Sequence, residues 1–231
     1  MSIYFIDSKL PSRIVIKENS RPAVAADLTF CPPSIMADDS TLDPHATNGL
    51  SLEEQELRVK AKKMAEAVAR VARKVNEVVE KREKHLDLSQ CALTSFPVGL
   101  YVVMVDVTQD IQSITLANNE IKTMTSKFFS IFTQLVELNL EGNVLQNLPD
   151  NISSLTFLTS INLSKNKFQE FPNKLLDVST IECINLEDNE IKDIPVEKLC
   201  SMSSLKTVNL KGNPVNKDLL DISKFKFDLI I

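Results

Sequence analysis

The chain has 231 residues, of which 43% are hydrophobic and 25% charged, and its formal net charge is −5. These values are ordinary for a globular protein, so they exclude disorder over the whole chain, and the mild acidity is not that of a nucleic-acid-binding protein. The longest apolar run, residues 98–105, is well short of the roughly 18 residues that a membrane-spanning helix needs, so no membrane span is expected.

The start of the chain and its cysteines indicate the cellular compartment. The opening MSIYFIDSKLP has neither a basic start nor a sustained apolar run, so no secretory signal is predicted. The cysteines are scattered without paired spacing, which is typical of reduced thiols in a reducing compartment. They are Cys31, Cys91, Cys183 and Cys200. We therefore expect a cytoplasmic protein.

Residues 1–50 differ in composition from the rest of the chain. They hold five of the ten prolines, and their apolar pieces are too short to build a core. This composition predicts a disordered extension. It is either a docking tail or an incidental extension, and we favour the second interpretation.

Residues 51–84 contain neither glycine nor proline, and Ser51 with Glu54 has the spacing of a capping box. A long amphipathic helix is predicted. Its apolar positions step by four and three, and alanines widen the stripe. The positions are Leu57, Ala61, Met64, Val68, Val71, Val75 and Val78. We expect this stripe to cover the N-terminal end of the structure that follows.

The same helix has the largest charge asymmetry in the chain. From Arg58 to Lys84 it carries ten Lys or Arg against four Glu, a net +6, which leaves −11 for all other residues. Two alternatives to capping remain. The helix could dimerise through its apolar seam, in an oligomerising or structural protein, or it could bind an anionic surface. We favour capping because a wide, alanine-rich stripe suits close packing on a sheet end, and we therefore expect a monomer in preference to a homodimer.

The frame L-x-x-L-x-L-x-x-N-x-L recurs every 23 or 24 residues through the second half of the chain. Its alternating leucines predict one short strand for each repeat, with the leucines on the core side of a parallel sheet. Counting a degenerate first copy, the frames begin at His85, Ile111, Leu135, Leu158, Ile181 and Leu205. The prediction is an α/β solenoid of six leucine-rich repeats over residues 85–215 with a curved parallel sheet, followed by a short cap over residues 216–231.

One polar residue follows each predicted strand at the asparagine position of the frame. An asparagine amide both donates and accepts, so it can pair otherwise unpaired backbone groups of adjoining repeats. A thiol does this only in part. This structural ladder consists of Cys91, Asn119, Asn143, Asn166, Asn189 and Asn213.

A column of prolines follows an apolar residue in four of the repeats, at Pro97, Pro149, Pro172 and Pro195. Repeats of 23 residues ending in Leu-Pro or Phe-Pro resemble the Ras-suppressor-like class of intracellular leucine-rich repeats. More closely, runs outside the frame as well as within it, such as KKMAEAVARVARKVNEVVE, resemble one family of small leucine-rich-repeat proteins over about residues 60–231. This resemblance implies a small cytoplasmic repeat protein and leaves its partner undefined. Residues 1 to about 60 have no counterpart in that family.

The sequence lacks the residue sets of common enzymes. Its four glycines form no phosphate-cradling array, and His85 is the only histidine outside the extension, which excludes Cys/His metal sites. Cys183 shares the strand position of His85, but four strand spacings of roughly 4.8 Å put it about 19 Å away. We therefore expect no catalysis, no cofactor and no metal.

The outward residues of the strands are the candidate binding site for a protein partner, in a non-catalytic adaptor. Asparagines in register form either a track for a peptide or hydrogen bonds to one another, and we favour the second interpretation. The glutamates predict a solvated acidic patch that prefers a basic partner. The candidate residues are Glu137, Asn139, Glu141, Ser160, Asn162, Glu182, Cys183, Asn185 and Glu187.

Overall fold

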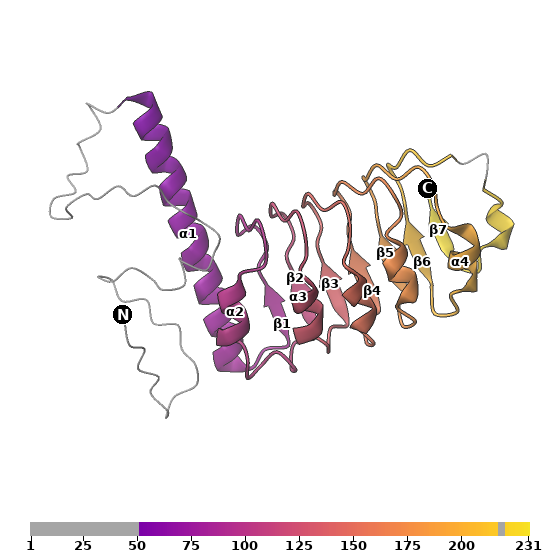
Figure 1. The fold of residues 1–231 in the computed structure, drawn as a ribbon, viewed down its shortest axis with the longest axis horizontal. Coiled ribbons are helices and arrows are strands. Elements are labelled where there is room, and N and C mark those ends of the chain that lie inside the picture. The colour runs from indigo at the N-terminus through magenta and orange to yellow at the C-terminus, as the bar shows by residue number, and fades with distance from the viewer. Residues whose placement is uncertain (1–50, 217–219) are drawn as a thin grey trace.

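A computed structural model describes residues 51–216 and 220–231. The extension expected for residues 1–50 lies outside the described residues, and so does Leu219 of the expected cap. The described chain forms one long helix followed by a row of strands joined by helical turns (Figure 1).

Seven strands form one parallel sheet in the order in which they occur in the chain. Each is three residues long, and every strand pairs with the next in the same register. The strands are β1 (His85–Asp87), β2 (Ser113–Thr115), β3 (Glu137–Asn139), β4 (Ser160–Asn162), β5 (Cys183–Asn185), β6 (Thr207–Asn209) and β7 (Asp228–Ile230). The predicted α/β solenoid of leucine-rich repeats is confirmed.

The alternation of side chains along each strand explains which face of the sheet is buried. The middle residue of each of the first six strands is at most 1% exposed, while both of its neighbours reach solvent. These middle residues are Leu86, Ile114, Leu138, Ile161, Ile184 and Val208. Because side chains alternate along a strand, one face of the sheet makes the core and the other stays open.

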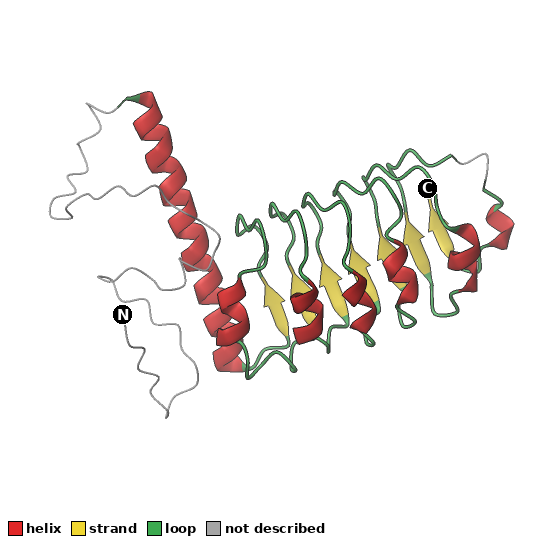
Figure 2. Ribbon diagram, viewed as in Figure 1, coloured by secondary structure: helices red, strands yellow, loops and turns green. Residues whose placement is uncertain are grey.

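Short helices cover the buried face and leave the other face free (Figure 2). They are α2 (Val98–Val103), α3 (Ser126–Ile131), η2 (Asp150–Ser154), η3 (Asn173–Asp177), α4 (Val196–Ser201) and η5 (Ile222–Lys224). Pro97, Pro149, Pro172 and Pro195 each stand immediately before one of these helices. A proline has no N–H to donate, so it suits a position where the backbone turns out of the sheet.

An aromatic cluster fills the space behind the first strands. The Phe128 ring lies 5.0 Å, between centroids, from the rings of both Phe96 and Phe132. The Tyr101 ring lies 5.1 Å from that of Phe96. The first connection between repeats, which is longer than the others, supplies Phe96 and Tyr101 and includes α2, so its extra length encloses this cluster.

The helix α1 (Leu52–Lys81) begins at the predicted capping box, in which the Ser51 hydroxyl accepts from the Glu54 N–H and the Glu54 carboxylate accepts from the Ser51 N–H. Its C-terminal half packs on β1 with Val71, Val75 and Val78 buried. The Lys74 ammonium also lies 3.0 Å from the Asp87 carboxylate at the end of β1. Capping of the sheet is therefore achieved by this half of the helix.

The prediction that the whole apolar seam covers the solenoid is wrong for the N-terminal half of α1. Leu57 is 44% exposed and Ala61 is also exposed, whereas the seam is fully buried only from Val71 onward. Figure 1 shows the reason, since α1 extends past the loops that follow the strands and no other helix or strand of the described residues lies beside it there. A helix of 30 residues is about 45 Å long at roughly 1.5 Å per residue, far longer than a three-residue strand.

The C-terminal end of the sheet is closed by β7, which continues the register of β6. Leu229 takes the place of the repeat leucines, and Phe227 and Ile231 also pack against the core. All three remain partly exposed. The Phe225 ring lies 5.2 Å from that of Phe227.

A column of left-handed residues stands just before the ladder positions. Six residues there have φ between 54° and 75°, although only two of them are glycines. They are Gln90, Asn118, Gly142, Lys165, Asp188 and Gly212. The backbone must turn sharply at this point to leave each strand, and this requirement overrides the usual preference against positive φ.

Substitution of Gly142 tests how strongly this turn constrains the fold. A Cβ at Gly142, where φ is +65°, would lie 2.6 Å from the Asn118 amide oxygen. We expect Gly142→Ala to lower the free energy of unfolding by about 1–2 kcal/mol in urea denaturation. The matched control is Gly99→Ala, since Gly99 lies in α2 with nothing within 4 Å of its would-be Cβ. It should raise stability by about 0.5–1 kcal/mol, and equal effects of the two substitutions would contradict the constraint.

Candidate binding surface

The open face of the sheet presents two columns of outward side chains, which we call the concave face. The first column contains the first residue of each strand and the second contains the third. In chain order the first column is His85, Ser113, Glu137, Ser160, Cys183, Thr207 and Asp228. The second is Asp87, Thr115, Asn139, Asn162, Asn185, Asn209 and Ile230. All the predicted strand residues of the site lie in these columns.

The asparagines of the second column do not bond to one another, so the favoured interpretation of this column is wrong. Each amide oxygen instead accepts a hydrogen bond from the backbone N–H two residues later. In the middle of the face, Asn162 accepts from Ser164 at 3.0 Å. Asp87 does the same for Ser89 at 2.8 Å. These side chains therefore form Asx turns that shape the loop leaving each strand.

The expected acidic patch is largely neutralised. Glu141, Glu182 and Glu187 each pair with a lysine one repeat further along the chain. The nitrogen-to-oxygen distances are 2.7 Å for Lys165–Glu141, 2.6 Å for Lys206–Glu182 and 3.8 Å for Lys211–Glu187. The first two hydrogen bonds raise the pKa of Lys165 and of Lys206, so both lysines stay charged. The expected preference for a basic partner loses much of its basis.

One glutamate of the predicted patch, Glu137, forms no ion pair within the described residues, and it is exposed. The Glu137 carboxylate only accepts a 3.5 Å hydrogen bond from the Ser113 hydroxyl. Within the described residues, negative charge that no ion pair neutralises lies on the concave face at Glu137, beside Asn139 and Ser160, and at Asp228 of the last strand.

His85 lies beside Ser113, a neighbour that the sequence argument against catalysis did not consider. The His85 Nδ1 is 3.0 Å from the Ser113 hydroxyl oxygen, and Cys183 is four strands away as expected. In a hydrolase triad the imidazole stands between the serine and the carboxylate. Here the serine stands in the middle, between His85 and Glu137, so no acid orients the imidazole.

Within residues 51–216 and 220–231, no group of three or more His, Cys, Asp or Glu side chains is placed to hold a metal ion. None of the helices in the same ranges is long and apolar enough to cross a membrane.

The asparagine ladder lies at the loop edge of the sheet. In the fourth repeat Asn166, which is 2% exposed, donates from its amide nitrogen to the carbonyl oxygens of Leu140 (2.9 Å) and Leu163 (3.0 Å). Its amide oxygen accepts from the Leu145 N–H at 3.0 Å. Asn119, Asn143, Asn189 and Asn213 repeat this pattern. Each amide thus joins its own repeat to the preceding one.

Cys91 begins the ladder, where no earlier repeat exists. Its thiol donates only to the Ser89 carbonyl, at 3.3 Å, and its backbone N–H donates to Asn119 of the next repeat. Burial raises the pKa of the Cys91 thiol, which keeps it protonated and apolar. A small apolar residue suits this position because α1, and not another repeat, lies against it.

Several residues that contact the candidate site from outside the strands were not predicted from the sequence. They are the pairing lysines Lys165, Lys206 and Lys211, together with Ser164, whose hydroxyl bonds to Asn162. A signal for the lysines was present, because each follows its glutamate at a distance of one repeat. Residues separated by one repeat lie side by side in such a sheet.

Parallel strands with polar outward columns, buried asparagines between repeats and helical turns on the other side define a leucine-rich-repeat protein. The chain belongs to the family of leucine-rich repeat-containing protein 20. It is 62% identical over 172 residues to that protein from Mus musculus and 58% identical over 172 residues to that from Homo sapiens. Both alignments cover 74% of this chain and 94% of the relative. A comparison with models of protein families finds no match.

Solved leucine-rich-repeat structures are similar over part of the chain. The Leptospira interrogans protein LIC12759 is 24% identical, with a TM-score of 0.47 over 58% of this chain and 38% of that one. The BIR2 ectodomain from Arabidopsis thaliana is 20% identical, with a TM-score of 0.43 over 56% of this chain and 68% of that one.

Substitution of two asparagines in the same repeat, one in the ladder and one on the concave face, distinguishes the roles of these two positions. Asn166→Ala leaves the buried Leu145 N–H without its partner and removes one of the two amide donors to each of the Leu140 and Leu163 carbonyls, so we expect it to lower the free energy of unfolding by about 2–4 kcal/mol. Asn162→Ala removes a half-exposed turn acceptor and should cost about 1 kcal/mol or less. Urea denaturation of both variants measures the difference. A loss for Asn162→Ala as large as that for Asn166→Ala would refute the separate roles.

Proposed function

We propose that this chain is a non-catalytic adaptor that binds an extended segment of another protein across its concave face. The observation that carries the proposal is the open sheet itself, with seven strands in one register and every helical turn on the opposite side (Figure 2). A surface of this kind contacts a ligand through side chains from many repeats at once. The leucine-rich-repeat family of the chain is consistent with this role.

The chemistry of the face favours a polar ligand. Its outward columns are mainly Asn, Ser, Thr, Asp and Glu, and the ion pairs at Glu141, Glu182 and Glu187 distribute both charges over it. A basic group of the ligand would form an ion pair with the carboxylate of Glu137. The proposed centre of the site is therefore Glu137 with Asn139, Ser160 and Asn162, and the site extends to Cys183 and Asn185.

The proposal that the chain has no enzymatic activity rests on the arrangement at His85. The imidazole has a serine neighbour but no orienting carboxylate, and the site is an exposed sheet surface that does not exclude water. We also propose the cytoplasm as its location, on the basis of the scattered cysteines and the resemblance to intracellular repeat proteins.

Arginines placed on the first column test the face without disturbing its turns. Ser160→Arg with Cys183→Arg changes two outward residues that do not form Asx turns. We expect proteins that copurify with the wild-type chain from cells to be reduced at least tenfold, as counted by quantitative mass spectrometry, because two long cations would occupy the central strands.

The matched control is Asn151→Arg with Asn173→Arg, which adds the same charge on exposed residues of the helical side, in η2 and η3. It should leave those proteins unchanged, and circular dichroism should show both variants folded. If the concave variant retains the wild-type set of partners, the concave face is not the binding site.

A further inference from the structure

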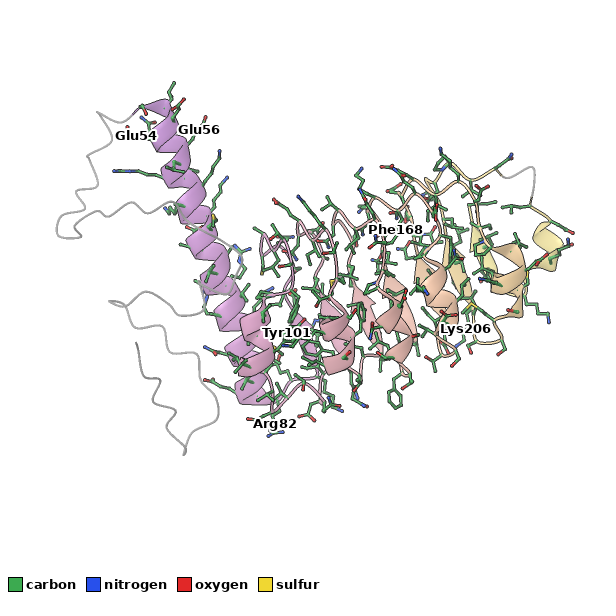
Figure 3. All side chains as sticks on the ribbon, viewed as in Figure 1. Glu54, Glu56, Arg82, Tyr101, Phe168 and Lys206 are labelled. Carbon is green, nitrogen blue, oxygen red and sulfur yellow. The ribbon has the colours of Figure 1, made fainter. Side chains whose placement is uncertain are left out.

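The middle of α1 is strongly basic. From Arg58 to Lys74 it carries seven Lys or Arg against a single acid, Glu66, a net +6. Of these seven cations, only Lys74 belongs to an ion pair within the described residues. Figure 3 shows the helix continuing away from the repeats to Glu54 and Glu56 at its outer end. The segment therefore presents a positive surface that the described part of the chain leaves almost uncompensated.

Four of these cations form a row on one flank of the helix, because they are spaced by three, seven and four residues. The members of the row are Lys60, Lys63, Arg70 and Lys74. Two contacts show which way this flank faces. The Lys74 ammonium lies 3.0 Å from the carboxylate of Asp87, which belongs to the second column of the concave face. The Arg70 guanidinium donates to the Gln90 carbonyl at 2.6 Å. The row therefore lies on the concave side of α1.

An apolar hollow of about 30 Å³ lies beside the row, in the corner where α1 meets the first repeat. It is lined by Met64, Ala67 and Val68 of the helix and by Cys91, Ala92 and Leu93, which follow β1. Ala67 stands between Lys63 and Arg70 along the same flank, so the hollow has a cation on either side. A space of this size admits the end of one apolar side chain.

We propose that this corner binds an acidic peptide segment of another protein, with one apolar side chain in the hollow and acidic side chains at Lys63 and Arg70. These two cations are about 10 Å apart along the helix, at roughly 1.5 Å per residue. In an extended peptide, side chains two positions apart point the same way, at roughly 3.3 Å per residue. The recognised pattern is therefore an apolar residue with an acid two positions to either side, and Lys60 pairs with a further acid.

The corner lies outside the centre of the site proposed for the concave face, and its ligand does not depend on that site. The charges of the two places are opposite, since Glu137 attracts a basic group and the row attracts acids. A segment that crosses the face from β3 to β1 arrives at the corner. One ligand with a basic part followed by an acidic part would thus satisfy both places.

The position of the row favours a peptide over other anionic partners. A flat bilayer touches the outer face of α1, where Glu66 and Glu80 stand among the cations, and it does not enter the corner. Proteins that bind single-stranded nucleic acid stack its bases on aromatic side chains. The hollow is lined by no aromatic residue and is too small for a base.

Fluorescence anisotropy of two synthetic peptides with the full chain tests the proposal. One peptide has a central leucine with a glutamate two positions to either side, and the other is an isomer of the same composition with the leucine at one end. The first is expected to bind at least fivefold more tightly, because only it places leucine between the two cations. Equal binding of the two peptides overturns the proposal, since charge alone would then account for the attraction.

Variants of α1 locate the binding. Lys60→Gln with Lys63→Gln should weaken the first peptide at least fivefold. The matched control, Arg58→Gln with Lys62→Gln, removes the same charge from other faces of the helix and should change binding less than twofold. Ala67→Leu fills the hollow and should abolish the preference for the first peptide. Equal losses in the two double variants contradict the assignment to the row, and circular dichroism verifies that all three variants remain helical.

Phosphatidylserine vesicles and a single-stranded oligonucleotide serve as the competing anionic probes. Each should bind more weakly than the first peptide. Tighter binding of either probe that is lost on Lys60→Gln with Lys63→Gln overturns the proposal and assigns the row to that partner instead. Because these assays use the purified chain and synthetic probes, their outcome is independent of the proteins that Ser160→Arg with Cys183→Arg displaces. The corner and the concave face can thus fail separately.

Discussion

Hydrogen bonding of the backbone between repeats is the constraint on which the rest of the structure depends. Strands of only three residues leave most of each repeat in turns, whose buried N–H and C=O groups need partners. The amides of Asn119 to Asn213 supply these partners at one point in each repeat, and the left-handed residue before each of them directs the chain toward that point. The leucine core can then stack in a single register.

The leucine alternation and the asparagine spacing were sufficient to predict the sheet, its register and the ladder, because both depend on fixed intervals along the chain. The extent of capping could not be predicted in the same way. A helical stripe from Leu57 to Val78 shows which side is apolar but not how far the opposing surface extends, and here that surface ends near Met64.

The concave face was predicted in its position but not in its bonding. Whether the Asn162 amide turns toward a neighbouring strand or toward the Ser164 N–H depends on the backbone that follows the strand, which a pattern of residue types does not specify. The ion pair between Glu141 and Lys165 was accessible to sequence reasoning, since the spacing of one repeat places the two side chains side by side. The contact between His85 and Ser113 was accessible for the same reason.

The two ends of the solenoid are closed by unequal means, and this determines where the molecule opens. At the first strand, α1 buries Val71, Val75 and Val78, whereas at the last strand Leu229 and Phe227 remain partly exposed. Because each repeat is held only by its neighbours, the loss of a terminal repeat uncovers the next one. Fraying therefore begins at β7 and advances toward β1, so the last repeats exchange their amide hydrogens earliest and the repeat beside α1 is the most durable part of the fold.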